Sequence, residues 1–194
     1  DVIQIVWARY TFHLLFLLIM LRHHIVGVLK TNHLKLQLGR STLLLVSSGF
    51  YFTGFTLLPL AESAAIINAT PILVTILSVP LLGERVGKQR WIGVAAGFCG
   101  ALIIIRPGMD SFSPAMLLPL CAALTYSLYQ IATRNVSHAD APITSITYTA
   151  IVGLIIGSII APFFWTPPDL FGWIMMAGIG LTGGVGHYAM IRAY

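Results

Sequence analysis

The sequence predicts an all-α membrane protein, and its composition, its hydropathy and the length of its apolar runs are the observations that predict it. The chain has 194 residues, of which 57% are hydrophobic and only 9% are charged, whereas soluble domains carry about 25% charged residues. The mean hydropathy is +0.89. A membrane β-barrel would instead show short segments of alternating hydrophobicity, so that architecture is disfavoured.

Seven apolar runs follow one another along the chain. Each is close to the ~20 residues that a helix needs to cross about 30 Å of hydrocarbon. The runs cover residues 2–21, 41–60, 63–82, 91–106, 114–133, 143–164 and 171–191. We predict that each run forms one transmembrane helix.

The basic residues indicate which connecting loops face the cytosol. The loops after the first, third and fifth runs hold most of the 11 Lys and Arg residues, namely Arg22, Lys30, Lys35, Arg40, Arg85, Lys88, Arg90 and Arg134. The intervening loops carry one basic residue, Arg106. Basic loops stay on the cytosolic side of a membrane, so we expect the first run to enter the cytosol at its C-terminal end. The same loops explain the net charge of +5, and no nucleic-acid partner is predicted.

The first run contains a charged residue, Arg9, well inside its apolar sequence. Ionisable residues inside a membrane usually face the interior of the helix bundle and often serve function. In that position Arg9 would attract an anionic or carboxylate-bearing solute. Alternatively, its long side chain reaches the outer membrane surface, which is only about two helical turns away.

The third run is interrupted by two prolines, Pro71 and Pro80. Each proline removes a helical hydrogen bond, and Pro71 thereby leaves the carbonyl of Ile67 without its usual donor. In hydrocarbon such a group must be satisfied by protein or by water in a cavity. Pro71 with nearby Asn68 therefore either lines a cavity or marks an ordinary kink, whereas Pro80 is expected only to bend the helix.

Polar side chains also occupy one face of later runs. Tyr126, Tyr129 and Gln130 follow helical spacing in the fifth run, where they suit either a cavity for a partly polar solute or hydrogen bonding between helices. A shorter polar face follows in the sixth run, and a histidine lies among glycines in the seventh. The predicted substrate-cavity residues are Arg9, Asn68, Pro71, Tyr126, Tyr129, Gln130, Thr147, Tyr148 and His187.

Several other kinds of chemistry are not predicted. The sequence lacks H-E-x-x-H and G-x-S-x-G motifs, so an enzyme is not predicted. A G-x-G-x-x-G match at 178–183 follows no strand and lies inside a membrane span, which argues against a dinucleotide site. The loop histidines have no acidic or thiol partners nearby, so no metal or other cofactor is predicted. No Asp or Glu pair inside a span suggests a proton relay.

A weak internal repeat relates the second run to the last. Gly54 aligns with Gly186, and Ala61 aligns with Ala193 at the same offset. Equivalent helices are then separated by an odd number of crossings, so the second copy would be inverted in the membrane. Inverted repeats with a site near the midplane are a transporter architecture.

The segment Glu62–Gly108 resembles the EamA-type permeases of the drug/metabolite transporter superfamily. The matching elements are Pro71, Gly83-Glu84, Gly93, Gly97, Gly100 and the closing Arg106-Pro107-Gly108, with Arg9 and Ala61 also fitting the pattern. The resemblance implies ten helices in two inverted five-helix repeats, of which this chain shows seven. Residues 1–108 would form the first half without its first helix, and residues 109–194 the second half without its last two.

The predicted function is a multi-pass secondary transporter in the bacterial inner membrane. It would export or exchange small amphiphilic metabolites, such as amino-acid-like solutes, by alternating access. Its partners would be the small-molecule substrate and the lipid bilayer. The Gly93-to-Gly97 spacing provides a close-packing face, either within the bundle or in a homodimer. A channel-like or non-transporting membrane protein and a small-molecule receptor are the alternatives.

Overall fold

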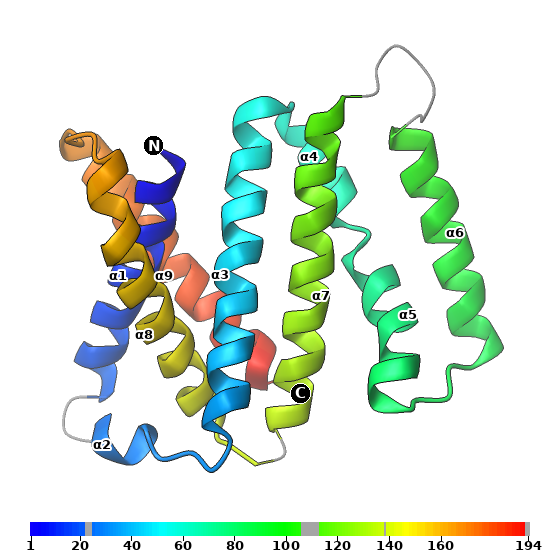
Figure 1. Ribbon diagram of the computed structural model, residues 1–194, viewed down its shortest axis with the longest axis horizontal. Coiled ribbons are helices and arrows are strands. Elements are labelled where there is room, and N and C mark those ends of the chain that lie inside the picture. Colours follow the sequence, from blue (N-terminus) through cyan, green and yellow to red (C-terminus); the bar gives the residue numbers. More distant parts are fainter. Residues whose placement is uncertain (22–24, 106–112, 138, 193–194) are drawn as a thin grey trace. The chain divides into compact units, whose positions relative to one another are not determined.

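The computed structural model describes residues 1–21, 25–105, 113–137 and 139–192, and every regular element in them is a helix (Figure 1). The elements are α1 (Val2–Leu21), α2 (Ile25–Val28), α3 (Leu34–Leu57), α4 (Leu60–Ile67), α5 (Thr70–Leu82), α6 (Lys88–Ile105), η1 (Pro114–Met116), α7 (Leu117–Ser137), α8 (Pro142–Ile160), η2 (Ala161–Phe164) and α9 (Leu170–Arg192). Each of the seven predicted runs overlaps one helix or a broken helix pair, with ends that differ by several residues. Arg106, the last residue of the fourth run, lies outside the described residues.

Five helical segments of the described chain are long and apolar enough to cross a membrane. They are Val2–Ile19, Leu60–Leu82, Pro114–Ser137, Pro142–Phe164 and Leu170–Ala189. The predicted spans in α3 and α6 are helical but fall outside this group. The helix α3 begins at Leu34 rather than at residue 41, and its first turns contain Lys35, Gln37 and Arg40, which lower its hydropathy.

The chain divides into two compact units. Unit 1 comprises Asp1–Leu45 and Ala132–Tyr194, and unit 2 comprises Val46–Ile131. The boundaries between the units fall within α3 and α7. These units are defined by contacts within the structure. They are distinct from the two repeat halves predicted from the sequence, 1–108 and 109–194, and that division stays a prediction.

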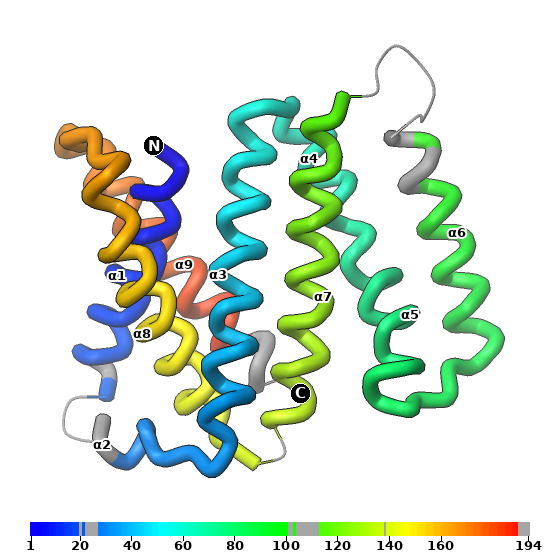
Figure 2. The backbone as a smooth tube through the Cα atoms, viewed as in Figure 1, coloured from blue at the N-terminus to red at the C-terminus, as the bar shows by residue number. Residues whose placement is uncertain are grey.

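In unit 1, α1 packs against both α8 and α9 (Figure 2). Leu17, Ile146 and Ala150 form a buried cluster between α1 and α8. Nearby, the Tyr10 ring lies directly over Gly153. A Cβ atom at position 153 would lie 2.2 Å from Cγ of the ring, so the close approach of these two helices depends on glycine at that position.

Tryptophans gather at one end of unit 1. The rings of Trp7 and Trp165 meet edge to face with centroids 5.3 Å apart, and the Trp165 and Trp173 centroids are 6.3 Å apart. The indole N–H of Trp7 donates to Oγ of Ser158 at 3.0 Å. Tryptophans concentrate at the interface between lipid and water, so this arrangement is typical of the end of a membrane bundle.

In unit 2, α6 packs against α4 and α5. A Cβ atom at Gly97 would lie 2.8 Å from Cδ1 of Ile72, so Gly97 is used for packing inside the unit. Elsewhere in the unit, Gly54 of α3 faces Pro119 of α7, at 3.3 Å from its would-be Cβ to Cδ. A small apolar cluster is formed by Leu58, Ile66 and Met116.

The third predicted span is interrupted next to Pro71, and Pro80 does not interrupt it. The helix α4 ends at Ile67 and α5 starts at Thr70, so Pro71 is the second residue of α5, where no intrahelical N–H is required. The Ile67 carbonyl accepts a hydrogen bond of 2.6 Å from the Thr70 hydroxyl. Pro80 lies within α5, which ends when Gly83 adopts φ +67°.

Candidate functional site

Arg9 packs inside unit 1 against the glycine-rich part of α9. It is partly buried, and a Cβ atom at Gly183 would lie 3.1 Å from its Nε atom. The side chain therefore lies alongside the α9 backbone, where a larger residue at position 183 would compete for the same space. His187 lies one turn further along α9, so the structure brings these two predicted residues to the same helix pair.

A third polar residue, His13, joins Arg9 and His187, and we refer to these as the Arg9–His13–His187 cluster. His13 is 3% exposed and lies one helical turn after Arg9. A Cβ atom at Gly184 would lie 2.7 Å from its Cδ2 atom and 3.1 Å from its Nε2 atom. The sequence analysis did not identify His13, although its i, i+4 spacing from Arg9 was the available signal.

The two imidazoles of the cluster differ in their hydrogen bonds. The Nδ1 atom of His187 lies 2.8 Å from the Gly183 carbonyl. A carbonyl can only accept, so in the neutral ring the proton is on Nδ1 and Nε2 carries the lone pair. The Nε2 atom of His13 is buried and makes no hydrogen bond to the part of the chain that the structure describes. Leaving such an atom unsatisfied costs about 1–3 kcal/mol, which favours a water or a ligand there.

The remaining predicted residues of unit 1 make architectural hydrogen bonds. The buried Thr147 hydroxyl donates to the Ile143 carbonyl of its own helix at 2.8 Å. The Tyr148 hydroxyl donates to the Leu29 carbonyl, also at 2.8 Å, and so ties α8 to the segment after α2. These bonds engage the single donor proton of each hydroxyl.

The other predicted residues lie in unit 2, around α7. The Tyr126 and Tyr129 rings stack with centroids 5.6 Å apart and planes inclined by 21°, so the shared face predicted from their spacing is confirmed. Tyr129 is fully buried, and Tyr126 and Gln130 are partly buried.

The break between α4 and α5 lies against the same helix. Asn68 and Pro71 are exposed at the break. The Ser127 hydroxyl on α7 donates to the Ala123 carbonyl of its own helix at 2.7 Å, and its oxygen lies 3.3 Å from the Thr70 carbonyl. Ser127 follows Tyr126 directly. Unit 2 therefore places a helix break beside an aromatic pair.

A buried polar network surrounds Arg40, which is not among the substrate-cavity residues predicted from the sequence. The sequence analysis assigned Arg40 to a loop, but it is a fully buried residue of α3. Its Nη1 atom donates to Oε1 of Gln37 and to the Ser145 carbonyl, both at 2.8 Å, and its Nε atom donates to the Thr133 hydroxyl at 3.1 Å. Because it joins α3 to α7 and α8, the guanidinium organises this end of unit 1.

A carboxylate completes the Arg40 network through a shared amide. The Nε2 atom of Gln37 donates to Oδ2 of Asp140 at 2.8 Å and to the Ser145 hydroxyl at 3.0 Å. The Thr31 hydroxyl donates to the same Asp140 oxygen. The positive charge of Arg40 and the negative charge of the partly buried Asp140 are therefore linked by one side-chain amide.

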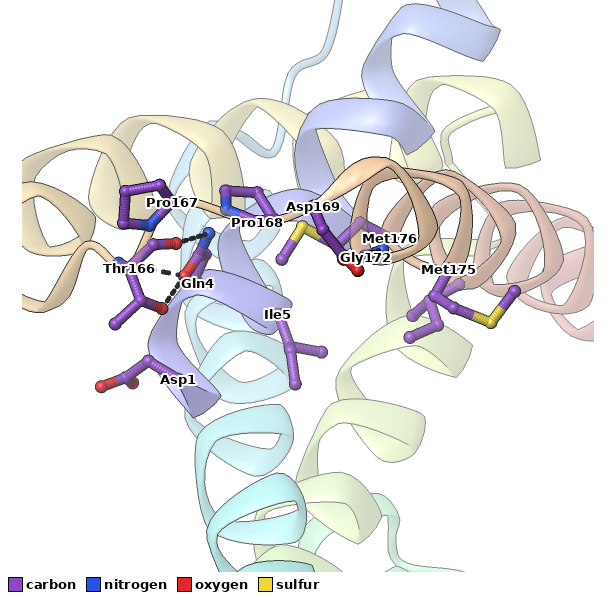
Figure 3. A pocket seen from close by; sticks show the side chains of 11 residues that line it. Asp1, Gln4, Ile5, Thr166, Pro167, Pro168, Asp169, Gly172, Met175 and Met176 are labelled. Atoms are coloured by element: carbon purple, nitrogen blue, oxygen red, sulfur yellow. Dashed lines mark hydrogen bonds between the residues drawn. The ribbon is translucent and has the colours of Figure 1, made fainter.

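At the tryptophan end of unit 1, an open pocket of about 470 Å³ lies between the start of α1 and the connection to α9 (Figure 3). Ile5, Pro167 and Met175 give it an apolar wall. The Gln4 amide is committed to Thr166, donating to its carbonyl and accepting from its hydroxyl, each at 2.8 Å. The lining of this pocket, at one end of unit 1, is therefore mostly apolar.

The comparison with known families decides the class of protein. The sequence profile of the EamA-like transporter family matches residues 1–106, more than half of the chain. The chain belongs to the EamA-like transporter family. The resemblance seen in Glu62–Gly108 is thereby confirmed. Family membership and the five apolar helical segments identify an integral, multi-pass membrane protein.

Several characterised relatives are similar to the chain. A riboflavin transporter of Vibrio cholerae is 31% identical over 137 residues, covering 70% of this chain and 46% of the relative. An S-adenosylmethionine uptake transporter of Rickettsia felis is 24% identical over 191 residues, covering 98% and 65%. An aromatic amino acid exporter of Ancylobacter novellus is 26% identical over 142 residues, covering 69% and 50%.

The relatives differ in substrate and in direction, but each is named for transport and none for catalysis. The matched region spans about half to two thirds of their length. No solved structure matches the chain significantly.

Proposed function

We propose that the protein is a secondary transporter that carries small, ring-bearing amphiphilic metabolites across the bacterial inner membrane by alternating access. The match to the EamA-like transporter family carries this conclusion. The relatives named above transport riboflavin, S-adenosylmethionine and aromatic amino acids. Each of these solutes combines a flat ring with polar groups.

The proposed substrate contacts rest on the chemistry of the polar residues, taken separately in unit 2 (Tyr126, Tyr129 and Asn68) and in unit 1 (Arg9). The stacked Tyr126–Tyr129 pair offers an aromatic surface for a ring. At the α4–α5 break, Asn68 offers a donor and an acceptor, and the Ile67 carbonyl keeps a second lone pair free of the Thr70 bond. Arg9 would attract a carboxylate or another anionic group.

Alternating access would come from two inverted five-helix halves that rock against one another. The break before Pro71 and the proline inside α5, Pro80, would support that motion, because neither position keeps a continuous ladder of helical hydrogen bonds. The direction of transport is left open by this proposal, since the relatives include uptake systems and an exporter.

Counterflow in proteoliposomes tests the proposal. The purified protein is reconstituted, and entry of radiolabelled riboflavin, S-adenosylmethionine and phenylalanine is measured with and without the same unlabelled solute inside. We expect saturable entry of at least one solute that internal solute accelerates, with lysine as a control without a ring. Entry that rises linearly with concentration would indicate a channel, and binding without entry would indicate a receptor.

A further inference from the structure

We infer that α1, α8 and α9 stay packed together throughout the transport cycle and hold the two predicted halves of the protein to one another. The inference rests on the proposed function and names the contact about which the halves would rock. The helix α1 belongs to the predicted half 1–108, whereas α8 and α9 belong to 109–194. All three lie in unit 1, where α1 packs against both of the others (Figure 1). We refer to this as the α1–α8–α9 contact.

The first support is the way that rings of α1 fit against glycines of α8. A Cβ atom at Gly153 would lie 2.2 Å from Cγ of Tyr10, and a Cβ atom at Gly157 would lie 3.4 Å from Cβ of Trp7. Further along α1, Leu17 belongs to a buried cluster shared with α8. Because Trp7 and Leu17 are ten positions apart in one helix, the closely packed surface is about 15 Å long.

The interface between α1 and α9 is built in the same way. A Cβ atom at Gly180 would lie 2.5 Å from Cβ of Phe12 and 3.1 Å from the Arg9 carbonyl oxygen. A Cβ atom at Gly184 would lie 2.7 Å from Cδ2 of His13. The surface of α1 therefore lies directly against the α9 backbone. Interfaces packed this densely do not deform continuously, so they resist sliding of one helix past the other.

Hydrogen bonds also tie the contact at the start of α1, the end that the charge distribution predicts to lie outside the cell. The Gln4 amide donates to the Thr166 carbonyl and accepts from the Thr166 hydroxyl, each at 2.8 Å. The Trp7 indole N–H donates to Oγ of Ser158 at 3.0 Å. Gln4 is only 1% exposed. Separation of the helices at this end would break all of these bonds at once, which opposes an opening there.

The opposite end of α8 is held by a further bond and by apolar packing. The Tyr148 hydroxyl donates to the Leu29 carbonyl at 2.8 Å, and Leu21 and Ile143 pack against the Leu17 cluster. The contact is thus packed in its middle and bonded toward both ends. The motion that exposes a solute to one side and then to the other would therefore lie in the remaining helices, with the α1–α8–α9 contact as their shared axis.

A disulfide across the contact tests the inference. Trp7→Cys with Gly157→Cys brings together two positions whose Cβ atoms would lie 3.4 Å apart, close to the mean of about 3.8 Å in disulfides. The variant is made without Cys99 and Cys121 and reconstituted in proteoliposomes. When oxidised, it should carry whichever of riboflavin, S-adenosylmethionine and phenylalanine the wild type carries, within about twofold of its reduced rate. Loss of counterflow on oxidation that a reductant reverses would overturn the inference.

Gly54→Cys with Leu118→Cys provides a matched disulfide. It joins α3 of the first predicted half to α7 of the second within unit 2, where the Cβ atoms would lie 3.8 Å apart. If the halves rock about the α1–α8–α9 contact, a covalent link at a second contact restricts that motion. We expect oxidation of this variant to slow counterflow at least about tenfold.

A spin-label distance tests the contact without transport, and it remains available if a disulfide variant fails to fold. Labels are attached to Leu15→Cys of α1 and Ile155→Cys of α8, both exposed positions, and the distance is measured by pulsed electron paramagnetic resonance in lipid nanodiscs. We expect one narrow distance that none of the three solutes changes. Two distances, or a shift of more than about 5 Å, one helical turn, would show that the helices separate and would overturn the inference.

The two proposals fail separately. Wild-type protein without counterflow of any of the three solutes refutes transport, and the spin-label distance then decides whether the contact is permanent. Counterflow that only the disulfide between positions 7 and 157 abolishes retains the transporter and refutes the permanent contact. Counterflow that neither disulfide affects retains the contact and refutes the rocking of the halves.

Discussion

Arg40 of α3 donates a hydrogen bond of 2.8 Å from its Nη1 atom to the Ser145 carbonyl on α8, across 105 positions of sequence. Both residues are buried. A buried guanidinium is stabilised only when several acceptors surround it, and here Gln37 and Thr133 supply further ones. The contact therefore connects three helices of unit 1 through one side chain.

We predict that Arg40→Met destabilises the protein. Loss of the guanidinium leaves the Ser145 carbonyl and the Gln37 side chain without their buried donor, and breaking a buried charge network costs about 3–5 kcal/mol. The free energy of unfolding in mixed detergent micelles measures the effect. Lys35→Met, at an exposed position of the same helix, should change it by less than about 0.5 kcal/mol. Equal effects of the two substitutions would contradict the role of Arg40.

Gly153→Ala should loosen the contact between α1 and α8. The added methyl group would lie 2.2 Å from the Tyr10 ring at its attachment atom, which cannot rotate away. Overpacking of this kind costs about 1–3 kcal/mol, measured by the same unfolding titration. Gly186→Ala is the matched control, because nothing lies within 4 Å of its would-be Cβ. If Gly153→Ala were as harmless as the control, the close packing would be wrong.

A cysteine at position 88 tests the predicted topology. In a background without Cys99 and Cys121, Lys88→Cys should resist a membrane-impermeant maleimide in whole cells and react after the cells are opened, because basic loops face the cytosol. Pro167→Cys, in the exposed segment before α9, should react from outside. Labelling of position 88 in intact cells would reverse the topology.

Asn68→Ala and Tyr126→Ala should each impair transport of the solute identified by counterflow. Loss of an aromatic contact removes about 0.5–1.5 kcal/mol beyond its buried area, so we expect an apparent affinity reduced several-fold, at equal expression. Phe163→Ala, at an exposed position, is the control and should transport normally. If both variants match wild type in rate and affinity, these residues do not line the path.

Apolar periodicity and proline chemistry are sufficient to predict most helices and the α4–α5 break. The run at 63–82 is predicted with an interruption at Pro71, and Thr70 explains how the Ile67 carbonyl is satisfied. The predicted start of α3 is too late because Arg40 resembles a loop charge. A hydropathy scale gives every arginine the same unfavourable value. It does not include hydrogen-bond acceptors such as the Ser145 carbonyl, which lies 105 positions later in the sequence.

Some of the local geometry around the candidate site is predictable from the sequence, whereas the role of these residues in substrate binding stays a prediction. Helical spacing places Tyr126 and Tyr129 on one face, and their stacking confirms it. His13 escapes prediction because nothing in α1 alone distinguishes it from a packing histidine. Its significance depends on Gly184, which faces it from another helix. Residues that act across two distant segments require the fold before they can be recognised.

The burial of Arg40 bears on how the chain enters the membrane during synthesis. Ser145 follows 105 positions later, and a ribosome adding about 5–20 residues per second delivers it about 5–20 s after Arg40. Until then Arg40, in the second turn of α3, opposes insertion of this helix end by less than the about 3 kcal/mol that an arginine costs at a helix centre. We expect α3 to remain near the translocon until α8 emerges, so that the order of insertion differs from the order of translation.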